Sequence, residues 1–131
     1  MNLLHLPAFI ILYIPHLVSL ADPIDKVAEL IRSGDIHELS GLFAPTIELS
    51  ILDDENVYAK AQAELVLQKF FKENKPGSVK VLHKINSNPN YQFGVLIFTS
   101  DKSAFRITCT LKQSSQRLAL IAMRIEKEKV K

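Results

Sequence analysis

The spacing of apolar residues changes about halfway along the chain, from the period of a helix to the period of a strand. Between residues 22 and 74, apolar residues recur every three to four positions, as on the buried face of an amphipathic helix. From Val79 onward they alternate with polar residues, as in strands that have one buried face. Helices followed by strands are typical of the α+β class, in which helices pack on one face of a sheet. We therefore predict a single α+β domain over residues 22–131.

Three helices are predicted before the long run of strands. The first begins at Asp22-Pro23, because Asp is a favoured N-cap and Pro is tolerated in the first turn, and it ends at Gly34. A second, short helix begins at the capping signal of Asp35 and is expected to end at Pro45. A short strand over residues 46–52 and a turn follow, and the third and longest helix then runs from about residue 58 to residue 74.

Four consecutive strands are predicted after the third helix. The segments that join them are short and polar, so we expect hairpin turns and a mostly antiparallel sheet. Because side chains alternate between the two faces of a sheet, one parity of each strand is expected to face the helices. The residues predicted to face inward are Val79, Val81, His83 and Ile85; Tyr91, Phe93, Val95 and Ile97; Phe105, Ile107, Cys109 and Leu111; and Ala119, Ile121, Met123 and Ile125.

The opposite parity of these strands is apolar for a face that would normally meet water. It carries Leu82, Leu96, Phe98, Leu118 and Leu120. A contiguous apolar surface on a small protein indicates an interface, so we expect a homodimer through the outer face of the sheet. The alternative is that these residues are scattered singly and have no partner.

The first twenty-one residues have the pattern of a secretory signal peptide. They contain no Lys, Arg, Asp or Glu, and they end in the small residues of Ser19-Leu20-Ala21. We therefore predict a leader over residues 1–21, cleavage before Asp22, and export to the periplasm or the extracellular space, with no membrane association after cleavage. The alternative is a retained membrane anchor, which Pro7 and Pro15 disfavour because proline interrupts a spanning helix.

Composition narrows the range of functions further. The 16 basic and 14 acidic side chains leave a net charge of only +2, which gives no field strong enough to indicate nucleic acid. Only His37 and His83 lie outside the leader, so no multi-histidine metal site is expected, and no cofactor is predicted. Cys109 is the one cysteine of the chain, so it forms no internal disulfide, and we expect it to be buried and inert; the alternative is an intermolecular disulfide.

Several spaced residues carry a family resemblance. They are the run Tyr58-Ala59-Lys60-Ala61-Gln62-Ala63, then Leu67, Phe70-Phe71 and Pro76, and then His83, Tyr91, Gly94 and Arg106. At these positions the chain resembles a bacterial family of small exported proteins that is classed as a domain of unknown function. That family has the nuclear transport factor 2-like, or cystatin-like, fold. The resemblance implies a cone, in which helices close over a strongly bent sheet and leave a pocket, but it brings no activity because function varies widely within this fold.

Four residues are candidates for lining such a pocket. Strand parity turns His83, Tyr91 and Cys109 toward the helices, and Gln62 lies on the long third helix. Each also has a structural interpretation, since buried histidine and glutamine side chains commonly satisfy neighbouring polar groups. A Cys109 thiolate activated by His83 would need direct contact and a third, orienting group.

Two functions of different classes remain open at this point. The first is a non-catalytic exported module that binds a small apolar ligand or another protein. The second is a small hydrolase or isomerase that uses a pocket containing His83. Isomerases of the resembled superfamily, such as ketosteroid isomerase, use an acidic base, and no Asp or Glu lies on the predicted inward face of the four long strands. Glu48 on the first strand is the remaining carboxylate that could reach the cavity, so the non-catalytic module is favoured.

Overall fold

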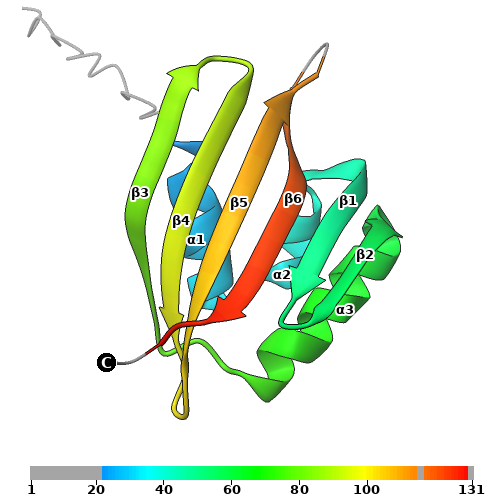
Figure 1. The fold of residues 1–131 in the computed structure, drawn as a ribbon. Helices are drawn as coiled ribbons and strands as arrows, with labels where there is room; N and C mark the ends of the chain where they lie inside the picture. Colours follow the sequence, from blue (N-terminus) through cyan, green and yellow to red (C-terminus); the bar gives the residue numbers. More distant parts are fainter. Residues whose placement is uncertain (1–21, 115–116, 130–131) are drawn as a thin grey trace, which may run out of the picture.

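Three helices and six strands form the structure, a computed structural model that describes residues 22–114 and 117–129 (Figure 1). The predicted leader, residues 1–21, lies outside the described residues. In chain order the elements are α1 (Pro23–Ser33), α2 (Ile36–Ser40), β1 (Phe43–Ile51), β2 (Asp54–Ala59), α3 (Lys60–Glu73), β3 (Ser78–Asn88), β4 (Tyr91–Thr99), β5 (Ala104–Gln113) and β6 (Leu118–Lys127).

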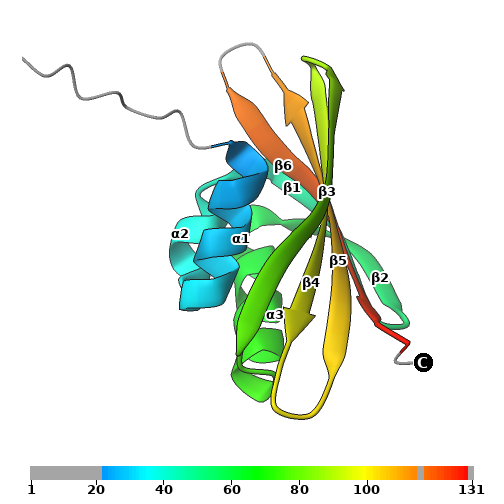
Figure 2. The ribbon, with the colours of Figure 1, turned by 90° about the vertical axis from the view of Figure 1, so that its left-hand side faces the viewer.

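The strands form one sheet in the order β2-β1-β6-β5-β4-β3. Neighbouring strands are antiparallel except β1 and β6, which are parallel, so the meander of β3 to β6 is confirmed. All three helices lie on the same face of the twisted sheet, which leaves the other face without a helical layer (Figure 2). The α+β class with a mostly antiparallel sheet is therefore confirmed, and we call the uncovered side the outer face.

The elements between residues 40 and 60 differ from the sequence prediction. The second helix ends at Ser40 rather than at Pro45, because Pro45 lies within β1 at an exposed position. The acidic segment after β1 was expected to be a turn, but Asp54–Ala59 forms a second strand that pairs with β1. The turn is confined to the two residues before it, and Leu52 there has a positive φ of 55°. The third helix consequently begins at Lys60, after a hairpin.

The predicted helix caps are confirmed. The Asp22 carboxylate accepts a hydrogen bond of 2.8 Å from the Ile24 amide at the start of α1, which satisfies a backbone donor that has no partner in the helix. Gly34 closes the same helix with a φ of 74°, a left-handed conformation that a residue without Cβ adopts readily. Asp35 caps α2 through a 3.1 Å bond from the Glu38 amide.

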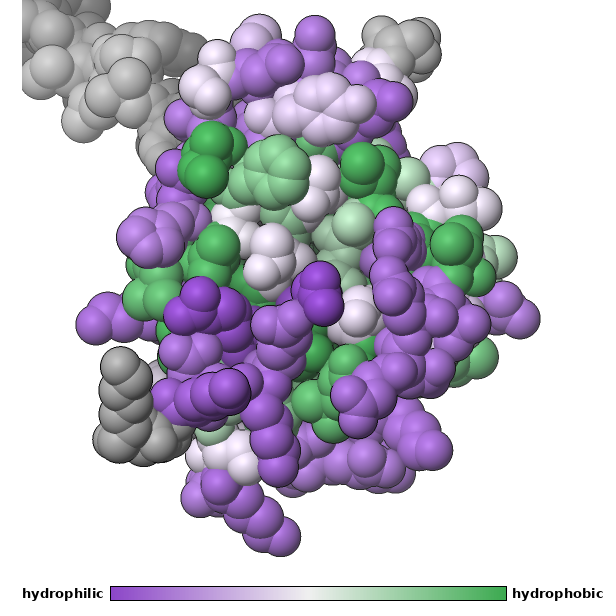
Figure 3. Space-filling view, in the orientation of Figure 1, coloured by the Kyte–Doolittle hydropathy of each residue, from purple (hydrophilic) through white to green (hydrophobic). Residues whose placement is uncertain are grey.

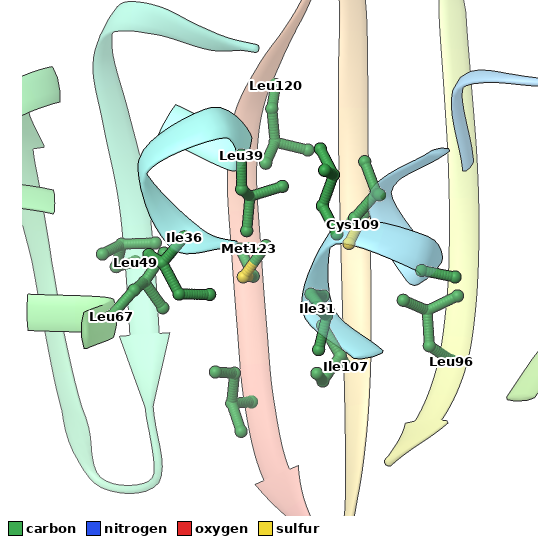
Figure 4. Close-up of a cluster of buried hydrophobic side chains, with 14 of the residues drawn as sticks. Ile31, Ile36, Leu39, Leu49, Leu67, Leu96, Ile107, Cys109, Leu120 and Met123 are labelled. Carbon is green, nitrogen blue, oxygen red and sulfur yellow. The ribbon is translucent and has the colours of Figure 1, made fainter. Parts of the chain in front are cut away.

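The hydrophobic core fills the space between the helices and the sheet (Figure 4). Side chains of the three helices, such as Ile31, Leu39 and Leu67, are completely buried against strand residues such as Ile107 and Met123. At one end of this core, four phenylalanine rings pack with centroids 5.2–5.6 Å apart. Two of them come from α3 and two from β4 and β5; they are Phe70, Phe71, Phe98 and Phe105.

Gly94 on β4 lies in close contact with the first turn of α1. A Cβ atom at this position would lie 2.5 Å from Cγ2 of Ile24, far inside normal van der Waals contact. Ile24 is itself 1% exposed, so its side chain has little room to move. Beside this contact, Nζ of Lys84 on β3 lies 2.7 Å from a carboxylate oxygen of Asp25. The same ammonium group lies 3.6 Å from a carboxylate oxygen of Asp22, so the start of α1 is held by one steric fit and by two ion pairs of Lys84.

Replacing Gly94 by Ala should destabilise the fold by roughly 1–3 kcal/mol, the usual cost of overpacking a filled core. The free energy of unfolding, measured by urea denaturation, gives this value. The matched control is the same change in an Ile24→Ala background, where space has been made for the new methyl group. A Gly94→Ala change that costs as much there as in the parent chain would contradict the contact as the cause.

Candidate functional site

The four residues predicted to line a common pocket do not meet in the structure. Cys109 is completely buried in the core, whereas Gln62 is exposed on α3. His83 and Tyr91 are also exposed, and they lie on the outer face of the sheet rather than toward the helices. Five hollows on the surface of the described residues, of about 180–560 Å³, are lined by none of the four. The predicted pocket is therefore not assembled by these residues.

The predicted orientation of His83 was wrong because β3 contains a bulge. Val81 pairs with Leu96 and faces the core, but the register shifts before the next pair, which joins His83 to Val95. The extra residue, Leu82, reverses the alternation of the side chains. His83 and Ile85 consequently lie on the outer face, and Ile85 is 56% exposed.

The predicted orientation of β4 was also wrong. Gly94 pairs with the buried Cys109, so Gly94, Leu96 and Phe98 face the helices. Tyr91, Phe93, Val95 and Ile97 therefore lie on the outer face. The side chains on both faces of this strand are apolar. The contact of Gly94 with α1 determines which face is buried. On β5 the predicted inward set, Phe105, Ile107, Cys109 and Leu111, is confirmed.

The residues first assigned to the outer face are consequently corrected. Leu96, Phe98 and Leu120 are completely buried in the core, and Leu118 packs against it. The pairing of β5 with β6 shifts its register between Thr110 and Leu111, and this shift turns Leu118 and Leu120 inward. Beyond the shift, Met123 and Ile125 are buried as predicted. Leu82 alone of the five is exposed, at 39%.

The outer face carries a different apolar surface. Its exposed members have exposed fractions of 37–56% and come from the β3-β4 hairpin, and two half-buried residues of β4 extend it. We call this set the apolar patch; it consists of Leu82, Ile85, Tyr91, Phe93, Val95 and Ile97. Figure 3 looks onto this face and shows hydrophobic side chains exposed over its upper part, with hydrophilic ones below.

Charges are distributed unevenly over the same face. No Asp or Glu occurs between residues 75 and 100, and Lys80 and His83 lie beside the apolar patch. Lys112 on β5 pairs with Tyr91, and its ammonium group lies 5.8 Å from the centre of that ring. At the opposite side of the face, Glu48 on β1 and Glu55 on β2 are exposed. The face is therefore basic on its β3-β4 side and acidic on its β1-β2 side.

A shallow hollow of about 190 Å³ lies on the acidic side of the outer face. The residues that line it come from β1, β2, β5 and β6; they are Glu48, Ser50, Glu55, Thr108, Thr110, Ala122, Met123 and Arg124. Glu48 was the carboxylate that could have reached an interior cavity. Its side chain instead points to the outer face, so this expectation is corrected. In the described ranges, no group of three or more His, Cys, Asp or Glu side chains is arranged to hold a metal ion.

No arrangement for nucleophilic catalysis connects Cys109 and His83. Burial without any charged partner raises the pKa of the Cys109 thiol to about 12, so the thiolate is scarcely formed at neutral pH. Cys109 lies on the inner face and His83 on the outer face, so the layer of the sheet separates them. Arg106 is exposed on the outer face and forms a bidentate ion pair with Glu128.

One polar cluster joins α2 to α3. Nδ1 of His37 lies 2.6 Å from Oε1 of Glu64, and the Ser40 hydroxyl lies 2.8 Å from the same oxygen. These hydrogen bonds, with the one from Ser40 the larger effect, lower the pKa of Glu64 below its usual value. The Ser40 hydroxyl contacts the carboxylate rather than the imidazole, so it is not activated as a nucleophile. The cluster fastens two helices together.

The comparisons with known proteins agree with this fold. The model of the family described as "Domain of unknown function (DUF4783)" matches residues 24–126. The chain belongs to the DUF4783 family. A crystal structure of a DUF4783 family protein from Bacteroides uniformis is 22% identical, with a TM-score of 0.78 over 83% of this chain and 100% of that one. No curated protein matches the sequence.

Two further structures place this DUF4783 chain among nuclear transport factor 2-like and cystatin-like folds. A domain of unknown function with a cystatin-like fold from Nostoc punctiforme is 8% identical, with a TM-score of 0.64 over 81% of this chain and 73% of that one. The structure named Rd1NTF2_04 with long sheet is 15% identical, with the same TM-score over 77% of this chain and 94% of that one. The fold resemblance drawn from the sequence is thus confirmed. Within the described residues, no helix is long and apolar enough to span a membrane.

The Glu64 cluster should make stability depend on pH in the acid range. Because folding lowers the pKa of this carboxyl, its contribution is present above the ordinary value of 4.5 and is lost as the pH falls through the folded value. Urea denaturation from pH 6 to pH 3 should therefore show a smaller loss of stability for Glu64→Gln than for the parent chain. Glu38→Gln, on α2, is the control. Equal acid dependence in the parent chain and Glu64→Gln would contradict the assignment.

Proposed function

We propose that this DUF4783 chain is a non-catalytic protein-interaction module that pairs with a second copy of itself through the outer face of its sheet. The observation that carries the proposal is the apolar patch, whose four most exposed members come from a single hairpin. Large apolar side chains gathered on one uncovered sheet face are the usual mark of an interface. The aromatic members Tyr91 and Phe93 are of the type that contributes most to binding energy.

The area of the outer face is sufficient for a stable interface. Six strands at the usual spacing of about 4.8 Å span roughly 24 Å, and strands of about nine residues are roughly 30 Å long. The product is about 700 Å² for each copy, close to the roughly 800 Å² per partner of a standard interface. Pairing through this face would cover the apolar patch completely.

The edge of the sheet offers a poorer route to association. The β3 strand at the edge contains two register shifts, and its exposed residues include Lys80 and Lys84. Bulges and lysines on an edge strand are features that oppose pairing with a further strand. The face of the hairpin is therefore favoured over its edge.

A small-ligand pocket and catalysis find less support. The space between the helices and the sheet is filled by the core, and Cys109, the one pocket candidate that lies there, is inert. The inward positions of the four long strands carry no carboxylate that could act as a base. The cone of the nuclear transport factor 2-like fold is, in this chain, proposed to serve as a rigid support for its outer face.

Export remains part of the proposal. The uncharged leader supports secretion to the periplasm or the extracellular space. Expression of the full chain in an exporting host provides the protein for the test below, and its intact mass shows whether residues 1–21 have been removed.

Sedimentation equilibrium of the exported protein should show a monomer-dimer equilibrium, and Phe93→Asp should weaken the dimer at least about 30-fold. That figure corresponds to about 2 kcal/mol, the threshold for a residue that dominates an interface. The charged side chain would have to be buried in the contact without a partner. Leu65→Asp is the matched control, because Leu65 is 64% exposed on α3, away from the outer face.

The proposal is contradicted if the parent chain remains a monomer at high micromolar concentration. It is also contradicted if Leu65→Asp dissociates the dimer as strongly as Phe93→Asp does. Thermal unfolding of both variants shows whether either change acts by damaging the fold.

A further inference from the structure

The strand registers align the apolar and acidic residues of the outer face in rows across the sheet. Following the paired residues from β3 to β2 gives a row that we call the central row. It consists of Ile85, Phe93, Thr110, Ala122, Glu48 and Val57. Its two ends are the most exposed apolar positions of the outer face, since Val57 is 71% and Ile85 is 56% exposed. A row with apolar ends and small residues in the middle is suited to contact a reversed copy of itself.

We infer that the two copies are related by a two-fold axis that runs parallel to the strands, between β5 and β6, so that the β3-β4 side of each copy covers the β1-β2 side of the other. This inference rests on the proposed function and specifies its geometry. A two-fold axis in the plane of the contact is required for two identical faces to meet. An axis along the strands reverses the order of the strands but keeps each cross-strand row at its own level.

In this arrangement the two ends and the middle of the central row match their counterparts in the second copy. Ile85 lies over Val57 of the second copy, which pairs the two exposed apolar ends. Phe93 on β4 lies over β1 of the second copy, at the position of Glu48 and the hollow beside it. The hollow of about 190 Å³ is lined in part by the small side chains of Thr110 and Ala122. Thr110 and Ala122, next to the axis, are small enough for the two sheets to approach.

The charges favour the same arrangement. In the neighbouring row, which runs from His83 through Val95 to Glu55, His83 would lie over Glu55 of the second copy. In a third row, Arg106 on β5 pairs with Glu126 on β6. Arg106 of one copy would therefore lie over Glu126 of the second copy, and Glu126 over Arg106. An axis perpendicular to the strands would instead place each basic side over the basic side of the second copy. Like charges that face each other across an interface are costly, which disfavours that alternative.

Cross-linking of single-cysteine variants distinguishes the two arrangements. Val57→Cys and Ile85→Cys are made in separate full chains, and each is exported and tested alone and after co-expression of the two. The reagent is a thiol-specific cross-linker that reaches about 10 Å, the usual distance between packed sheets. Within one chain the two positions are five strand spacings, about 24 Å, apart, so a 57-85 cross-link joins two copies. The buried Cys109 stays unlabelled and needs no replacement.

We expect a covalent heterodimer from the co-expressed pair and no covalent dimer from either variant alone. Leu65→Cys co-expressed with either variant is the control and should give no covalent product. Covalent dimer from Ile85→Cys alone, or no product from the mixed pair of a chain that sediments as a dimer, would overturn the two-fold arrangement and leave the proposed function standing. A chain that sediments as a monomer would overturn both.

Discussion

The close packing of Ile24 against Gly94 is the contact on which the arrangement of the sheet depends. It brings the first turn of α1 close to β4, because the Ile24 side chain packs directly over the backbone of Gly94. Because residues of a strand alternate between its two faces, this contact assigns Leu96 and Phe98 to the core and leaves Phe93 on the outer face. The outer surface of β4 is thus a consequence of helix packing on the other side of the sheet.

The neighbouring strand adapts to the same helix by a bulge. Val79 and Val81 face the core at one end of β3, and the extra residue Leu82 then exchanges the two faces. The exchange turns Lys84 toward α1, where it pairs with Asp25, and turns Ile85 outward. The bulge therefore serves both to fasten the helix and to extend the apolar patch along the hairpin.

These two features mark the limit of what could be predicted from the sequence. The helix caps at Asp22 and Gly34, the change of period after α3, and the inward face of β5 are local or alternating signals, and each was confirmed. The parity of β4 was ambiguous because the sequence is apolar on both faces, and a bulge has no clear sequence signal when the residue inserted is apolar, as Leu82 is. The candidate site failed for this reason, since two of its four residues were assigned to the wrong face. An apolar outer face was predicted, but its residues were identified only once the packing at Gly94 was known.

The function proposed for this DUF4783 chain rests on two features of the described residues. No catalytic arrangement is found among them, and the outer face exposes the apolar patch. Among the described residues, the interior holds one inert thiol and no carboxylate on the long strands, whereas the outer face combines exposed aromatic rings with separated charges. A rigid, filled core supports such a surface well, because interface side chains that are already ordered lose little freedom on binding.

The most direct test of this account is a dilution series of the exported chain, observed by NMR through the methyl signals of Val57, Ile85 and Leu65. Pairing through the outer face predicts that the signals of Val57 and Ile85, which lie at opposite edges of one sheet, shift together with a single dissociation constant. The signals of Leu65 should not change with concentration. Signals that do not change with concentration, or that change at Leu65 instead, would contradict it.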